Sequence, residues 1–213
     1  ENYSEEGFLR VCELEDITDT YEDKLGSYLV KIIKNELEDG QDSAVNMLLR
    51  TLTDFERMGD HAKNLAETAQ EIHSKNIRFS PDAKTESANL YAAIREILAE
   101  TEKAFVEDDI ETAFRIAPLE EIIDSLCGSC KQNHIERVRR QICEYSHGFA
   151  YNDMLTDLER VGDHCFNLSI ALQRRHGEID ARHGILTKQE IEHTHNYERI
   201  FSEYAAKYMN TEV

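Results

Sequence analysis

The sequence has no tryptophan, only two prolines and nine glycines, and aromatic residues make up just 8% of it. So few helix-breaking residues leave long stretches that can form uninterrupted helix. With few aromatic side chains, the core must be built mainly from Leu, Ile, Val and Ala. Five cysteines, an odd number at irregular spacing, do not predict a disulfide framework and favour a reducing, intracellular setting.

Basic residues are also scarce. Lys and Arg number 24 against 43 Asp and Glu, which gives a net charge of −19. Binding to a phosphate backbone needs a positively charged stripe, so this composition argues against a nucleic-acid partner. An anionic membrane surface would repel the chain as well, and cations are its natural partners. No apolar run approaches the roughly 20 residues that cross a bilayer, and no secretory signal is visible.

Apolar residues recur at intervals of three and four, the spacing of amphipathic helices, and no segment reads as a strand. A turn at 38–43, a break at 107–109 and glycines near 148 and 177 separate the periodic stretches. Pro118 falls inside one stretch and predicts either a kink or a later helix start there. The result is six predicted helices, over about residues 8–37, 44–74, 81–107, 110–141 and 148–175 and from about 187 onward.

The chain contains an internal repeat. Residues 53–66 read TDFERMGDHAKNLA and residues 156–169 read TDLERVGDHCFNLS, with nine of fourteen positions identical at an offset of 103. Upstream, LEDITD at 14–19 matches LEEIID at 119–124 at an offset of 105. Two matches at nearly the same offset indicate duplication of a three-helix unit. We therefore predict two such units, residues 1–107 and 108–213.

Each unit carries two Glu-x-x-x-Asp motifs. Residues i and i+4 project from one helix face, and the two motifs of a unit lie about equally far from the turn between their helices. An antiparallel hairpin then brings four carboxylates together. They repel one another unless protons or a cation neutralise them, and hard metal ions prefer oxygen-rich sites. The predicted metal ligands are Glu15, Asp19, Glu56 and Asp60 in the first unit and Glu120, Asp124, Glu159 and Asp163 in the second.

Two other interpretations of these motifs stay open: they could form a solvated acidic face, or Arg57 and Arg160 could draw them into ion-pair networks of a purely structural scaffold. Gly59 and Gly162, inside otherwise good helices, suggest close helix approach or room for a ligand. We expect several neighbouring side chains to surround the ligands without necessarily binding metal. Asp54 and Asp157 lie behind the ligands, and His61 and His164 are expected to orient neighbouring groups. Asn64 and Asn167 could either supply an amide oxygen to the metal or cap a neighbouring backbone group.

Signals of catalysis are weak. The sequence shows no phosphate loop, nucleophile elbow or dinucleotide fingerprint. The paired Glu-x-x-His motifs of di-iron bundles are missing, and Cys127 and Cys130 read as buried helix cysteines because no second Cys pair accompanies them. We therefore predict a protein that is not an enzyme, with a di-metal carboxylate enzyme as the alternative.

The segments TDFERMGDHAKNLAE and TDLERVGDHCFNLSI resemble the LERIGDHA-N-AE signature of the PhoU family, and LEDITD and LEEIID resemble its companion motif. The resemblance spans nearly the whole chain. It implies an all-α fold of two tandem three-helix bundles, metal clusters bound by the Glu/Asp-x-x-x-Asp pairs, and a role in repressing phosphate uptake. It assigns one metal site to each unit's four motif carboxylates, with iron, zinc, manganese or magnesium as candidate ions.

Two stretches, ELEDITDTYEDKLGSYLVKI and HIERVRRQICEYSHGFAYNDMLTDLERVGDHC, resemble more narrowly the cytosolic C-terminal domain of bacterial sodium/phosphate cotransporters. A start at Glu1, without Met, agrees with excision from such a transporter. The resemblance implies a regulatory module at the inner face of the plasma membrane whose partner is a membrane phosphate transporter, in cis or in trans. Stand-alone PhoU proteins carry more sequence before the first motif, so a truncated first helix is expected. A stand-alone repressor of phosphate import is the alternative, and a homodimer is a further expectation.

Overall fold

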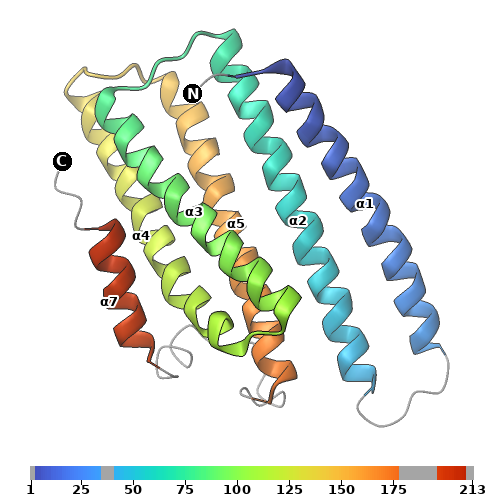
Figure 1. The fold of residues 1–213 in the computed structure, drawn as a ribbon. Helices are drawn as coiled ribbons and strands as arrows, with labels where there is room; N and C mark the ends of the chain where they lie inside the picture. The colour runs from blue at the N-terminus through green and yellow to red at the C-terminus, as the bar shows by residue number, and fades with distance from the viewer. Residues whose placement is uncertain (1–2, 35–40, 178–195, 210–213) are drawn as a thin grey trace.

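The computed structural model describes residues 3–34, 41–177 and 196–209, and every regular element in these ranges is an α-helix (Figure 1). The predicted all-α class is therefore confirmed. The predicted start of the last helix near residue 187 lies outside the described residues. The described helices are α1 (Glu5–Ile33), α2 (Gln41–Ser74), α3 (Pro81–Glu107), α4 (Ile110–Arg139), α5 (His147–Arg175) and α7 (Tyr197–Tyr208).

Capping groups explain where three of the helices begin. The Ser4 hydroxyl accepts the Gly7 N–H at 3.0 Å, so α1 starts three residues earlier than predicted. Ser80 caps α3 in the same way, and Asp109 caps α4 by accepting the Thr112 N–H. Pro118 lies buried inside α4, which runs on from Ile110, so the reading of Pro118 as a later helix start is wrong. The Asp109 cap supplies that start instead.

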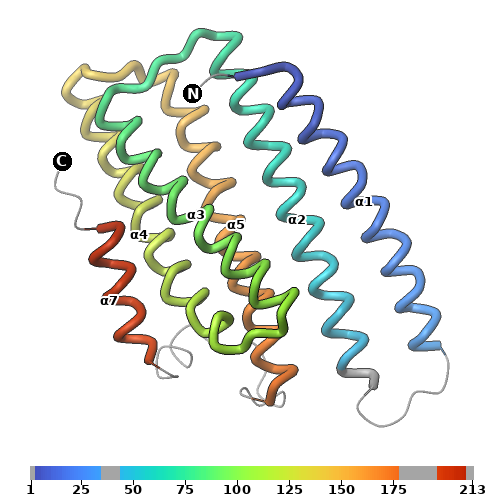
Figure 2. The backbone as a smooth tube through the Cα atoms, in the orientation of Figure 1, coloured from blue at the N-terminus to red at the C-terminus, as the bar shows by residue number. Residues whose placement is uncertain are grey.

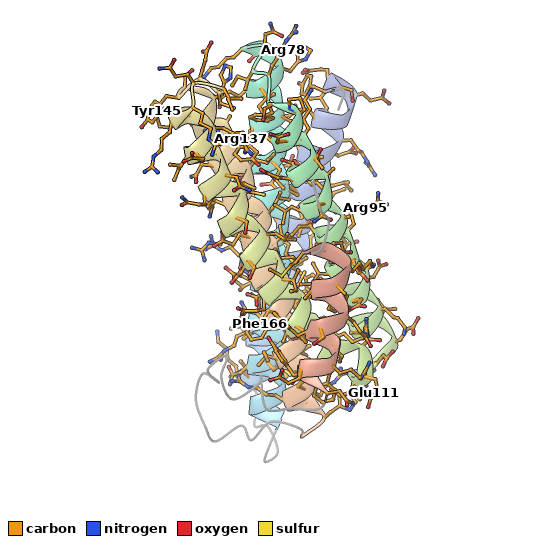
Figure 3. The ribbon with its side chains drawn as sticks, turned by 90° about the vertical axis from the view of Figure 1, so that its left-hand side faces the viewer. Arg78, Arg95, Glu111, Arg137, Tyr145 and Phe166 are labelled. Atoms are coloured by element: carbon orange, nitrogen blue, oxygen red, sulfur yellow. The ribbon has the colours of Figure 1, made fainter. Side chains whose placement is uncertain are left out.

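Consecutive helices run antiparallel, and α2 and α5 lie side by side in the middle of the array (Figure 2). α1 packs on α2 and forms one edge of the molecule (Figure 1). On the other side of α5, α3 and α4 pack against it and against each other. α7 packs against α4 and α3 (Figure 3). None of the helices in the described ranges has the length and apolar character needed to cross a membrane.

The hydrophobic core is concentrated where α3, α4, α5 and α7 meet. Its fully buried side chains include Leu90 and Ile97 of α3, Leu119 and Ile122 of α4, Leu155 and Leu158 of α5, and Tyr204 of α7. The repeat in the sequence divides the chain at residues 107 and 108, but the packing joins α3 to the second hairpin, α4–α5. The first hairpin, α1–α2, is attached mainly through the contact of α2 with α5.

Candidate metal centre

Three carboxylates of the first hairpin converge. Glu15 and Asp19 lie one turn apart on α1, and Asp60 faces them from α2; one oxygen from each lies within 4.8 Å of the others. Glu15 is buried, with 6% of its surface exposed, whereas Asp19 is exposed and Asp60 half-buried. The antiparallel pairing predicted from the distance of each motif to the turn therefore brings these three carboxylates together. We call them the first carboxylate cluster.

The second hairpin repeats this arrangement. Glu120 and Asp124 on α4 face Asp163 on α5, again with one oxygen from each within 4.8 Å of the others. Glu120 is 1% exposed, and Asp124 and Asp163 are half-buried. These three residues form the second carboxylate cluster. Equivalent positions of the repeat thus build the same geometry twice, which is what a site defined by the motif spacing requires.

The geometry of each cluster fits a hard metal ion. An octahedral ion with oxygen ligands at about 2.1 Å places neighbouring oxygens about 3 Å apart and opposite ones about 4.2 Å apart. The three carboxylate oxygens of each cluster, which lie within 4.8 Å of one another, are close to that spacing. Because all three side chains are carboxylates, the donor set suits magnesium, manganese or iron better than a soft-ligand metal.

The remaining two predicted ligands lie outside these three-residue clusters. Glu56 lies 3.6 Å from the guanidinium of Arg57, and Glu159 pairs with the Lys131 ammonium at 2.6 Å. Both glutamates were predicted as ligands on the assumption that the two helices of a hairpin are directly opposed. Four residues of helix span about 6 Å, so the aspartate of each α2 or α5 motif reaches the cluster while the glutamate lies a turn away beside a cation.

Electrostatics in the first hairpin show the expected repulsion. Loss of part of its hydration shell, followed by the neighbouring Glu15 and Asp60 carboxylates, raises the pKa of the exposed Asp19. Partial burial and then the Asp60 carboxylate raise the pKa of Glu56. Both shifts favour the neutral form, as expected for like charges held together. A bound cation would relieve the same repulsion.

Basic side chains relieve part of this repulsion: Arg160, already expected from the sequence to form ion pairs, and Lys63, which was not expected to do so. The Lys63 ammonium on α2 donates to both carboxylate oxygens of Glu15, each at 2.8 Å. In the second hairpin the exposed Arg160 guanidinium contacts Asp163 at 3.1 Å. Lys63 follows Asp60 by three residues and so shares its helix face. That spacing is the signal in the sequence that points to this lysine.

The residues expected behind the ligands join the two repeats to each other. His61 Nδ1 on α2 lies 2.8 Å from Asp157 Oδ1 on α5, and the Asn64 amide donates to the same oxygen. His164 and Asn167 of α5 bond Asp54 of α2 in the mirrored way, at 3.0 Å each. The two imidazole rings stack with their centroids 5.6 Å apart. We call these six residues the repeat bridge, in which each asparagine amide donates to an aspartate of the other repeat.

Glycine and cysteine predictions are resolved by the packing. A Cβ placed on Gly59 would meet Thr18 at 3.7 Å, and one on Gly162 would meet Ile123 at 3.5 Å and Glu120 Cγ at 3.8 Å. These are ordinary contacts, so neither glycine marks a forced close approach, but both adjoin the carboxylate clusters.

Cys127 and Cys130 are buried free thiols, and burial raises the pKa of both. The prediction of buried helix cysteines is confirmed.

Comparisons with known proteins agree with the motifs. The model of the PhoU domain family matches residues 1–69 and 88–171. The phosphate-specific transport system accessory protein PhoU homolog 1 of Thermotoga maritima is 31% identical over 121 residues, which is 57% of this chain and 51% of the relative. The chain thus spans about half the length of that curated relative.

Two solved structures share the fold. The crystal structure of PhoU from Pseudomonas aeruginosa superimposes with a TM-score of 0.74 at 20% identity, covering 81% of this chain and 82% of that one. The phosphate transport system regulatory protein PhoU from Streptococcus pneumoniae gives a TM-score of 0.70 at 18% identity, covering 82% of each chain. Since the family model matches well over half of the sequence and the helices adopt the same arrangement, the chain belongs to the PhoU family.

Proposed function

We propose that this chain is a regulatory module of phosphate uptake that holds metal ions at its two carboxylate clusters and acts on a membrane phosphate transporter. The observation on which the proposal rests is the placement of the clusters. Both form from the duplicated family motifs, and both place three carboxylates within 4.8 Å. A solvated acidic face would not require Glu15 and Glu120 to be 6% and 1% exposed.

The transporter partner is supported by the relatives. The Thermotoga relative is named as an accessory protein of a phosphate-specific transport system, and this chain shares its family. The likeness of two stretches to the cytosolic domain of sodium/phosphate cotransporters favours attachment in cis, at the inner face of the plasma membrane. The upstream reading frame distinguishes the two arrangements. Several apolar spans of about 20 residues would establish a fusion, and an immediate Met start would favour a stand-alone regulator.

Metal would supply the chemistry that the side chains lack. A divalent ion held by three carboxylates would offset two of their three negative charges and so reduce their mutual repulsion. In each cluster, the buried glutamate holds one carboxylate in place on α1 or α4. The aspartate on α2 or α5 adds a carboxylate from the other helix of the hairpin. Phosphate itself would be repelled by this surface unless such an ion intervened.

Phosphate uptake in cells tests the regulatory role. The native gene would be expressed with Asp60→Asn and Asp163→Asn together, and uptake of labelled phosphate would be compared in phosphate-rich and phosphate-poor medium. We expect the double variant to keep its helices and to lose repression of uptake in rich medium. Asp153→Asn, which changes an exposed aspartate of α5 outside both clusters, is the matched control. Uptake that does not respond to the double variant would contradict the proposal.

A further inference from the structure

A lysine beside the first cluster already supplies positive charge of the kind that a metal ion would bring. Lys63 extends from α2 to the buried Glu15 on α1 and donates to both of its oxygens at 2.8 Å. Glu15 has 7% of its side chain exposed and Lys63 has 34%. The ammonium therefore lies at the edge of the cluster, on its most buried ligand. An ion that takes Glu15 as a ligand must share or displace this lysine.

The equivalent position of the second repeat holds no cation. At the offset of 103 residues, Phe166 (labelled in Figure 3) stands where Lys63 does. Phe166 packs against Ala117 and Ile170. The lysine of the second hairpin, Lys131, instead pairs with Glu159, which lies outside the second cluster. Its counterpart at the offset of 105 is Gly26. Lys63 of the first hairpin thus contacts a cluster carboxylate, whereas Phe166 stands at the equivalent position of the second hairpin.

The arginine beside the second cluster forms a weaker ion pair than Lys63 does. Arg160 contacts Asp163 of the second cluster, but it is 60% exposed and belongs to an i,i+3 pair on one helix. Pairs of that kind contribute little, because water screens them. The Lys63 pair joins two helices and covers both oxygens of a buried carboxylate, so it is the stronger of the two ion pairs.

We propose that Lys63 is a built-in competitor of metal at the first cluster: it neutralises Glu15 when no ion is bound, and binding of a divalent cation there requires its release. This inference rests on the proposed metal-binding function. Hydrogen bonds to charged groups are worth enough to lower an affinity roughly 10-fold or more when they must be broken first. The lysine thus sets the cation concentration at which the first cluster fills, and it holds α1 to α2 below that concentration.

Manganese titration of the first cluster alone tests the competition. In the full chain carrying Asp163→Asn, which disables the second cluster, calorimetry with Mn²⁺ would compare Lys63, Lys63→Gln and Lys63→Arg. We expect Lys63→Gln to raise Mn²⁺ affinity about 10-fold and Lys63→Arg to leave it near the wild-type value. Without metal, Lys63→Gln should lower the melting temperature, and added Mn²⁺ should raise it by more than in the parent.

The reciprocal exchange gives a second arm. In a chain carrying Asp60→Asn, Phe166→Lys should weaken Mn²⁺ binding at the second cluster; if that variant does not fold by circular dichroism, the Lys63 series decides alone. Mn²⁺ binding with the same affinity for Lys63 and Lys63→Gln would overturn the competitor role while leaving the metal site intact. No Mn²⁺ binding by the parent chain or any variant would instead remove the proposed function, and the competitor role with it.

Discussion

The two hairpins of this protein carry the same motifs at equivalent positions, but within the described residues α4 is covered by α3 and α7, whereas α1 packs mainly on α2. Leu119 and Ile122 on α4 are 0% exposed beneath α3 and α7, whereas their counterparts on α1, Leu14 and Ile17, are 46% and 42% exposed. Both hairpins nevertheless form a three-carboxylate cluster. The difference shows that the cluster depends on the spacing of the motifs within a hairpin, while burial and stability depend on the helices packed outside it.

The largest expected effect is a loss of stability on truncating a leucine that is buried in one hairpin and exposed in the other. Leu119→Ala should lower the free energy of unfolding by about 2–5 kcal/mol because it opens a cavity in the core. Leu14→Ala, at the equivalent exposed position, should lower it by less than about 1 kcal/mol. Urea denaturation of the two variants measures both values. Similar losses would mean that the first hairpin is as enclosed as the second.

The repeat bridge is symmetric and should respond symmetrically. Asp157→Ala removes the partner of His61 and Asn64, and Asp54→Ala removes the partner of His164 and Asn167. Each change should reduce stability by about 1–2 kcal/mol, since a half-buried histidine and an exposed asparagine lose their shared partner. Asp153→Asn serves as the exposed control. Clearly unequal losses from Asp54 and Asp157 would show that the two halves do not contribute alike to this contact.

A smaller effect is expected at the helix-interior glycines. Because an added methyl group would make only ordinary contacts, Gly59→Ala and Gly162→Ala should each stabilise the metal-free protein by up to about 1 kcal/mol through helix propensity. Thermal unfolding in the presence of a chelator checks this. A loss of stability at either position would mean that the helix backbone there needs glycine, although a methyl group has room.

The smallest effect concerns Glu56. Since the folded protein raises the pKa of this acid, the folded state binds its proton more readily than the unfolded state does. The penalty for its charge is therefore absent below its ordinary pKa, near pH 4.5, and appears as pH rises through the raised value.

Glu56→Gln should then stabilise the metal-free protein at pH 7 by up to about 0.5 kcal/mol and change nothing at pH 4. Urea denaturation at the two pH values measures the gap. Glu159→Gln, which removes the Lys131 ion pair, should give no such gain. A Glu56→Gln gain that persists at pH 4 would rule out charge repulsion as its cause.

The sequence predicted the helices well because their ends are encoded locally. Ser80 with Pro81, and Asp109, mark helix starts by their own chemistry. The convergence of Glu15 and Asp19 with Asp60 was also predictable, since an antiparallel hairpin leaves little freedom in which residues face each other. The positions of Glu56 and Glu159 were not, because one helical turn decides whether a side chain meets the opposite motif or a nearby cation.

Contacts between the repeats were beyond the sequence argument. The repeat assigns α3 to the first unit, yet the short connection at Asp108 and Asp109 keeps α3 beside α4. Nothing in a duplicated motif says which hairpin an adjoining helix covers. Asp54 and His61 lie seven residues apart, as do Asp157 and His164, and this spacing places each pair on one helix face. That face was visible in the sequence, but its partner across the α2–α5 contact was not.

The claim that the clusters hold metal is tested most directly by the metal content of gently purified protein, measured by elemental mass spectrometry before and after chelation. We predict at least one equivalent of iron, manganese, zinc or magnesium per cluster, with Asp60→Asn and Asp163→Asn each losing the share of its own cluster and Asp153→Asn losing none. A protein that carries no metal, takes up none after chelation and reloading, and melts at a temperature that added cations do not change would contradict the account. The carboxylates would then be parts of an ion-pair scaffold.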